Sequence, residues 1–136
     1  MKPALIRNDD VAWQAYPGDG GEPIRLKRLV SRERQGSELG MGLTELPAGR
    51  STVWWSFLPK DDTGPDEMWF GDRCHETYYI LNGRVRMTWR DRAGKKGSVA
   101  AGPGDSLYMA PGYRYQVSTI GDEPALFLFA FMPSAR

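Results

Sequence analysis

Apolar and polar residues alternate along several short segments of this chain. The clearest case is residues 84–90, where Val85, Met87 and Trp89 fall on one side and arginines or Thr88 on the other. A period of two predicts a β-strand with one buried face. Less regular apolar segments predict further strands at 24–30, 37–46, 51–58, 68–80, 98–101, 107–110, 113–119 and 125–131. Many short strands and no long amphipathic helix predict an all-β sandwich or barrel.

Turn signals separate these segments. Asn82-Gly83 is a strong signal for a tight turn, because both residues tolerate a positive φ. The stretch 8–23 is polar and interrupted by glycine and proline, which predicts an N-terminal arm over residues 1–23. A chain of this length is expected to form one domain, here residues 1–136.

Composition narrows the classes of function. The 136 residues carry 18 basic and 17 acidic side chains, so no strongly basic face is implied and nucleic acid is not an expected partner. A single cysteine excludes an intrachain disulfide and favours a reducing compartment. No apolar run approaches the about 20 residues of a membrane-spanning helix, and the N-terminus lacks the apolar stretch of a secretory signal. We expect a cytoplasmic protein with no membrane partner.

Two segments of the chain carry a family resemblance. The first, from Gly71 to Gly83, reads Gly-Asp-Arg-Cys-His-Glu-Thr-Tyr-Tyr-Ile-Leu-Asn-Gly, and the second runs from Gly104 to Tyr115. Together they resemble the two sequence motifs of the cupin family of small β-barrels. The resemblance covers about residues 47–131 and implies an all-β, double-stranded β-helix (jelly-roll) barrel of the small single-domain kind. It also implies a homodimer, because cupins of this size commonly pair through strands.

The resemblance implies a metal site from which most ligands are missing. In the family the two motifs carry three histidines and one glutamate that hold a metal. Glu76 stands at the glutamate place, and Tyr115 stands at the histidine place of the second motif. The two histidine places of the first motif depend on the alignment frame. They hold Phe70 and Asp72 if the motif starts at Gly64, or Trp55 and Phe57 if it starts at Gly49. Both frames stay open, and neither restores a histidine.

Strand parity orders the candidate site residues. Side chains alternate between the faces of a strand, so an inward Glu76 brings Asp72, Cys74 and Tyr78 inward with it. His75 then points outward, to the surface or to a dimer interface. The predicted site pairs Glu76 with Tyr115 as catalytic residues, and its substrate-binding residues are Trp55, Phe57, Phe70, Asp72, Tyr78 and Tyr113. Apolar walls with a few placed polar groups are typical of a small-molecule site.

This pocket predicts acid–base chemistry without the usual three-histidine metal site. Burial disfavours the charged form of a carboxylate, so the pKa of Glu76 is expected to rise, which suits a general base or acid. Proton abstraction next to a carbonyl, as in the sugar epimerases of the superfamily, or a lyase reaction would then act on a small polar substrate. A structural alternative for Glu76 is a buried carboxylate paired with an arginine or a tyrosine for stability.

Two other functions stay open. One is a non-catalytic cupin that binds a small ligand as a sensor or accessory protein, like the metal-free cupin of ethanolamine-utilisation operons that the chain loosely resembles. The other is an atypical, dioxygenase-like metal cupin in which Glu76, Tyr115 and either Asp72 or His75 hold iron, zinc, nickel or manganese. Such sites usually rely on several imidazoles or thiolates, and the chain has one histidine. We therefore expect no cofactor.

Overall fold

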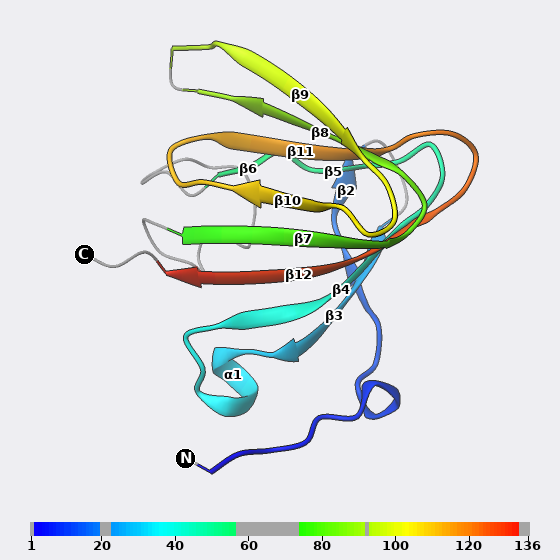
Figure 1. The fold of residues 1–136 in the computed structure, drawn as a ribbon. Coiled ribbons are helices and arrows are strands. Elements are labelled where there is room, and N and C mark those ends of the chain that lie inside the picture. Colours follow the sequence, from blue (N-terminus) through cyan, green and yellow to red (C-terminus); the bar gives the residue numbers. More distant parts are fainter. Residues whose placement is uncertain (1, 20–22, 57–73, 92, 134–136) are drawn as a thin grey trace.

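The described chain forms two antiparallel β-sheets that face each other, as the alternating pattern predicts (Figure 1). The computed structural model describes residues 2–19, 23–56, 74–91 and 93–133. One sheet, sheet A, has the strand order β1 (Gln14–Tyr16), β3 (Ile24–Val30), β4 (Gly40–Leu46), β12 (Ala125–Pro133), β7 (Cys74–Asn82) and β10 (Ser106–Met109). The other, sheet B, has the order β2 (Gly18–Asp19), β5 (Ser51–Thr52), β11 (Arg114–Thr119), β8 (Val85–Arg90) and β9 (Lys96–Ala101), with β6 (Trp55–Ser56) beside β11. The sheets make the expected jelly-roll barrel.

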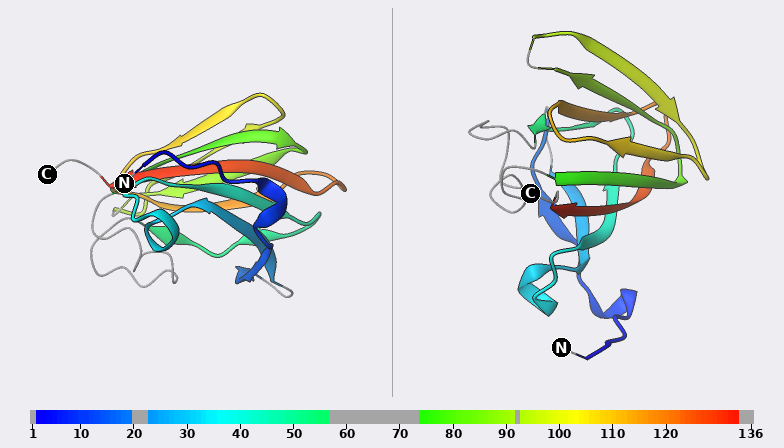
Figure 2. Two further views of the ribbon diagram at one scale, coloured as in Figure 1. Left: turned by 90° about the horizontal axis from the view of Figure 1, so that it is seen from below. Right: turned by 60° about the vertical axis from the view of Figure 1, so that its left-hand side comes forward.

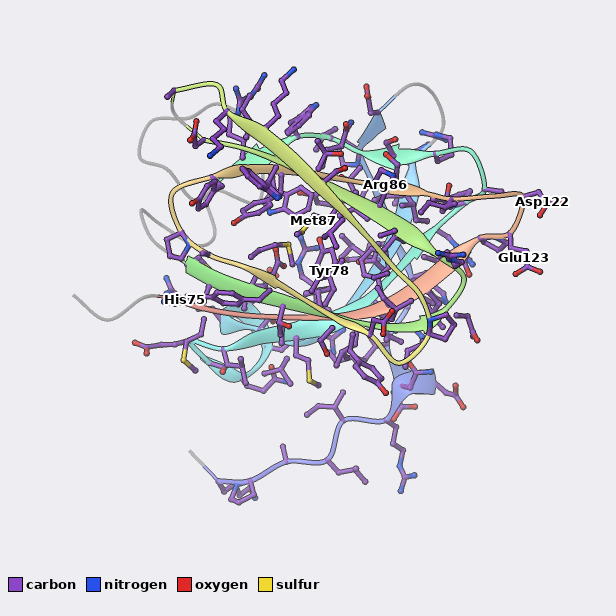
Figure 3. All side chains as sticks on the ribbon, turned by 45° about the horizontal axis from the view of Figure 1, so that its top comes forward. His75, Tyr78, Arg86, Met87, Asp122 and Glu123 are labelled. Carbon is purple, nitrogen blue, oxygen red and sulfur yellow. The ribbon has the colours of Figure 1, made fainter. Side chains whose placement is uncertain are left out.

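Strand parity fills the space between the sheets with apolar side chains. Val85 and Met87 of β8 are buried while Arg86 between them is exposed, which confirms the predicted alternation. Figure 3 shows Tyr78 and Met87 directed into the space between the sheets and Arg86 directed away. The side chains with essentially no exposed surface include Phe127, Ile24, Leu46, Ile80, Met109, Val85 and Val117. This core comes from both sheets, so neither sheet is stable without the other.

Two predicted strands differ from the structure. The segment 51–58 was predicted as one strand, but β5 and β6 are separated by residues 53 and 54, and residues 57 and 58 lie outside the described part. The segment 37–46 becomes a strand only at Gly40, because a short helix, α1 (Arg32–Gln35), precedes it. The Ser31 hydroxyl accepts a hydrogen bond from the Arg34 amide at 3.1 Å, and Gly36 ends the helix in the left-handed conformation.

The Asn82-Gly83 turn joins the two sheets. Gly83 has a φ of +77°, which confirms the turn signal. The turn leads from β7 in sheet A to β8 in sheet B, so these consecutive strands do not pair with each other. A Cβ at Gly83 would lie 2.4 Å from the carbonyl oxygen of Pro124, so the position needs glycine for space as well as for conformation.

The N-terminal arm belongs to both sheets. It carries a 3-10 turn, η1 (Asn8–Asp10), and two short strands, with β1 beside β3 in sheet A and β2 beside β5 in sheet B. The arm also covers Lys27 of β3, whose ammonium donates to the Asn8 carbonyl at 3.1 Å and lies 4.8 Å from the Trp13 ring. Figure 2 shows this segment running along sheet A. No helix in the described part is long and apolar enough to cross a membrane.

Candidate functional site

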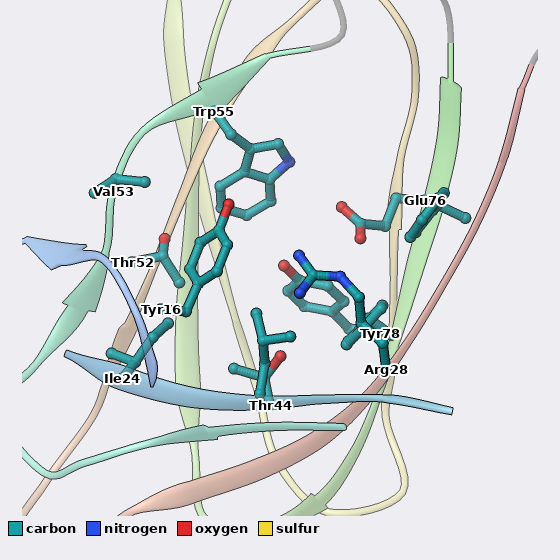
Figure 4. A pocket seen from close by; sticks show the side chains of 12 residues that line it. Tyr16, Ile24, Arg28, Thr44, Thr52, Val53, Trp55, Glu76 and Tyr78 are labelled. Atoms are coloured by element: carbon teal, nitrogen blue, oxygen red, sulfur yellow. The ribbon is translucent and has the colours of Figure 1, made fainter. Parts of the chain in front are cut away.

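A pocket lies between the inner face of sheet A and the β5–β6 segment of sheet B (Figure 4). It holds about 560 Å³ of space, the part open to solvent included. Among the described residues, apolar side chains make up most of the wall, and the polar side chains that reach it are Tyr16, Arg28, Thr44, Thr52, Glu76 and Tyr78.

Strand β7 supplies the acid of the pocket. Its burial alternates strictly, with Cys74, Glu76 and Tyr78 buried and His75 and Thr77 exposed. This confirms the predicted parity. The Glu76 side chain is only 6 % exposed, and it points into the pocket beside Tyr78. Asp72, which the same parity places inward, lies outside the described residues.

The floor of the pocket is flat because two glycines lie under two phenylalanines. In sheet A, Phe131 of β12 lies between Gly40 and Glu76, and Phe129 lies between Gly42 and Tyr78. A Cβ at Gly40 would lie 2.0 Å from the Phe131 ring, so only glycine lets the ring rest on the β4 backbone. The rings stack 6.2 Å apart with an interplanar angle of 8°. This packing leaves open space above the floor.

Arg28 brings a positive charge into the pocket, and sequence reasoning missed it. It lies on the inward side of β3, in line with the buried Ile24 and Leu26. Its Nη1 donates to Gln14 Oε1 at 3.0 Å, and its guanidinium lies 5.8 Å from the centre of the Tyr16 ring. The sequence did contain a signal for it, because Arg28 follows Ile24 and Leu26 at the third inward position of the alternating segment 24–30. Tyr16 carried no such signal, because a three-residue strand has no readable period.

Trp55 forms a wall of the pocket. Its ring centre lies 6.2 Å from that of Tyr78 and 5.8 Å from that of Tyr115. The indole Nε1 is buried and has no hydrogen-bond partner among the described residues. The first-motif frame that starts at Gly49 predicts Trp55 at the site, and the structure brings it there. Phe57 of that frame and Phe70 of the other lie outside the described residues.

Tyr115 lies in a neighbouring pocket. This second space is lined by Met87, Trp89, Tyr108, Ala110, Tyr113 and Tyr115. The Tyr115 hydroxyl donates to the Ala110 carbonyl oxygen at 2.6 Å. Burial raises the pKa of Tyr115 well above its usual value, and the nearby Tyr113, Tyr108 and Glu76 raise it further against the effect of that hydrogen bond. The structure therefore gathers Glu76, Trp55 and Tyr78 in one pocket, and Tyr113 and Tyr115 in the other.

His75 and Cys74 sit apart from the Glu76 pocket. His75 is exposed, as the parity predicts, and its Nδ1 lies 2.6 Å from the Tyr108 hydroxyl on the outer face of sheet A. Cys74 is fully buried, and burial, with a smaller effect of Glu76, raises the pKa of its thiol to about 12. A thiol with that pKa stays protonated near neutral pH, which makes it a poor nucleophile.

The described residues do not fit a divalent metal. They contain no group of three or more His, Cys, Asp or Glu side chains placed to hold an ion. Of the described side chains that line the pocket, Glu76 is the only carboxylate, and Arg28 is a cation in the same space. A guanidinium opposes the approach of a metal cation, whereas transition-metal sites gather several anionic or imidazole ligands.

Similar solved structures share this fold. A structure of a predicted oxalate decarboxylase from Thermotoga maritima has a TM-score of 0.69 and 18% identity, with 96% of this chain and 100% of that chain covered. A Drosophila melanogaster CENP-C cupin domain has a TM-score of 0.68 and 10% identity, with 93% and 74% covered. Bacillus subtilis oxalate decarboxylase, a protein with Mn(II) centres, has a TM-score of 0.64 and 20% identity, with 89% and 29% covered. These likenesses concern the fold alone.

Sequence comparison identifies the family. No curated protein sequence matches the chain significantly. The family model for the cupin domain matches residues 53–131, which is more than half of the chain and includes the glutamate strand and the second motif. The jelly-roll barrel and its pocket at Glu76 agree with that match, and the chain therefore belongs to the cupin family.

Proposed function

We propose that this cupin is an enzyme that uses Glu76 as a general base and acid on a small polar organic molecule. The reaction class would be an isomerisation, an epimerisation or a lyase-type elimination. The observation that carries the proposal is a carboxylate that is 6 % exposed in a largely apolar pocket, with hydroxyl groups on the same wall. All three reactions begin when a base removes a proton from a bound molecule.

The pocket also supports the return of the proton. Tyr78 follows Glu76 on the inward face of the same strand, and Tyr16 reaches the pocket from β1. The motifs predict Tyr115 as the partner of Glu76, but its hydroxyl donates to the Ala110 carbonyl oxygen. We therefore favour Tyr78 as the proton donor.

The test is deuterium incorporation from solvent, followed by proton NMR. The protein is incubated in heavy water with a panel of small hydroxy acids, keto acids and sugars. The wild type should exchange the acidic carbon-bound proton of at least one compound. Glu76→Gln should slow that exchange by about 100-fold or more, since general acid–base groups typically contribute that much. Tyr78→Phe should slow it more than Tyr115→Phe does.

Glu45→Gln is the matched control. Glu45 is a carboxylate on β4 that faces away from the pocket and pairs with Arg25. The same chemical change there should leave the exchange rate unaltered. Exchange that survives Glu76→Gln would refute the role of Glu76. Compounds that bind without any exchange would refute catalysis and favour a ligand-binding cupin.

A further inference from the structure

We infer that the molecule bound in the Glu76 pocket carries a carboxylate and that Arg28 receives it. This deepens the proposed function, on whose assignment of the pocket it rests, by naming the chemical class of the substrate. Arg28 and Glu76 are the only charged side chains among the described residues that line the pocket. Figure 4 shows the Arg28 guanidinium and the Glu76 carboxylate reaching into the same space from β3 and β7 of sheet A.

The strand register explains how the two charges face one space. Arg28 of β3 pairs with Gly42 of β4, and Gly42 pairs with Phe129 of β12, which in turn lies beside Tyr78 of β7. Strands are about 4.8 Å apart, so the row from Arg28 to Tyr78 spans about 14 Å of backbone. Between its ends lie only a glycine and a flat ring. The floor between β3 and β7 therefore carries no long side chain in this row, and the pocket lies above it.

The arm fixes the orientation of the guanidinium. Its Nη1 donates to Gln14 Oε1 at 3.0 Å, and its Cζ lies 5.8 Å from the Tyr16 ring centre. A guanidinium held on one side can offer its other N–H groups in the parallel pair that matches the two oxygens of a carboxylate. An ion pair with Glu76 would not prevent this, because the remaining donors can serve two acceptors.

A second donor points to the same class of ligand. Trp55 is 8 % exposed, and its Nε1–H has no acceptor among the described residues although it is buried at the pocket wall. A buried donor without an acceptor is costly, and a ligand oxygen would remove that cost.

The experiment compares acids with their uncharged amides on the unmodified protein. Isothermal titration calorimetry at neutral pH is run with malonate against malonamide, and with lactate against lactamide. The acids should bind and the amides should bind at least about tenfold more weakly. Equal binding of acid and amide would overturn the inference, and so would the absence of binding by every acid tested. This comparison needs no variant.

Variants of Arg28 then test whether this residue binds the acid. Arg28→Gln should weaken acid binding by about 10- to 100-fold, and Arg28→Lys, which keeps the charge but loses the paired donors, should lie between. Arg25→Gln removes the same charge from the outer face of the same strand, and it should bind acids like the wild type. An Arg28→Gln protein that keeps its cooperative melting and binds acids unchanged would overturn the inference.

Failure of the proposed function gives a different result. Glu76→Gln removes a negative charge that repels the acid, so acid binding should be retained or strengthened while deuterium exchange is lost. Acids that bind through Arg28 but never exchange a proton would refute the general-base role and leave the carboxylate assignment standing. Exchange of neutral sugars alone would refute the carboxylate assignment and leave the role of Glu76 standing.

Discussion

The glycines under the pocket floor leave no space for an added methyl group. In Gly40→Ala the new Cβ would lie 2.0, 2.3 and 2.5 Å from three atoms of the Phe131 ring. Carbon atoms pack at about 3.5 Å or more, so the ring must move by about 1.5 Å away from β4. Overpacking of this kind costs about 1 to 3 kcal/mol. The shifted ring would also narrow the pocket beside Glu76.

A double-mutant cycle separates this clash from other effects. Phe131→Ala alone should cost about 3 kcal/mol, because the ring is buried. In the combination with Gly40→Ala the new methyl group enters space that the ring has left. The double variant should therefore be about as stable as Phe131→Ala alone, which gives a coupling energy of about 2 kcal/mol. Urea denaturation measures these free energies, and an unchanged m-value shows that the unfolded state is comparable.

Gly42 supplies the matched control on the same face of β4. A Cβ there would lie 1.9 Å from the backbone carbonyl oxygen of Lys27 and 2.7 Å from the Phe129 ring. Truncation of Phe129 leaves the backbone obstacle in place, so Phe129→Ala should relieve little of the cost of Gly42→Ala. The steric account of the floor would be refuted if the stability losses of Gly40→Ala and Phe131→Ala simply added. It would also be refuted if removing the phenylalanine ring reduced the cost of the alanine equally at Gly40 and at Gly42.

Three further predictions concern stability. Burial raises the pKa of the Cys74 thiol to about 12 in the folded protein, against 9.0 for a free thiol. The protonated thiol therefore stabilises the fold fully below pH 9, and this stabilisation is lost as the pH rises to 12. Cys74→Ala should reduce the loss of stability between pH 9 and pH 12 by up to about 1.4 kcal/mol per pH unit, measured by urea denaturation. Gly83→Ala should lower the melting temperature by several degrees, because it combines a φ of +77° with a 2.4 Å contact to Pro124; Gly94→Ala, with a positive φ and open space, should cost less. Thr52→Val should cost about 1 to 3 kcal/mol, since the Thr52 hydroxyl accepts a hydrogen bond from the buried amide of Val117 at 3.0 Å, and an unchanged urea midpoint would contradict this.

Local patterns predicted the parts of the site that lie on one strand. The alternation along β7 was enough to place Glu76 and Tyr78 inward and His75 outward, because a regular strand fixes the side of every residue. The same reasoning was enough for Val85 and Met87 on β8. The two motifs added the barrel and the position of the acid, which a period alone does not give.

The sequence does not predict which strands that are distant in the chain lie side by side in the sheets. Arg28 and Glu76 line one pocket although β4 and β12 lie between their strands, and the sheet order depends on the packing of the whole barrel. Tyr16 enters the pocket through a three-residue pairing that leaves no pattern in the chain. The motif positions of Tyr115 and Glu76 likewise say nothing of the Trp55 ring, which lines the Glu76 pocket and contacts Tyr115.

The central place of β12 in sheet A has a consequence for how the protein is made. β12 joins the β1-β3-β4 half of the sheet to the β7-β10 half, yet the other strands that the structure describes all precede it in the chain. A ribosome adds about 5 to 20 residues per second, so the strands of both halves are made before β12 is available to join them. Until then each half has an open edge where β12 will pair. The floor of the pocket, Phe129 and Phe131, arrives with this same strand. A nascent chain that stops before residue 125 should therefore bind no ligand and should depend on chaperones.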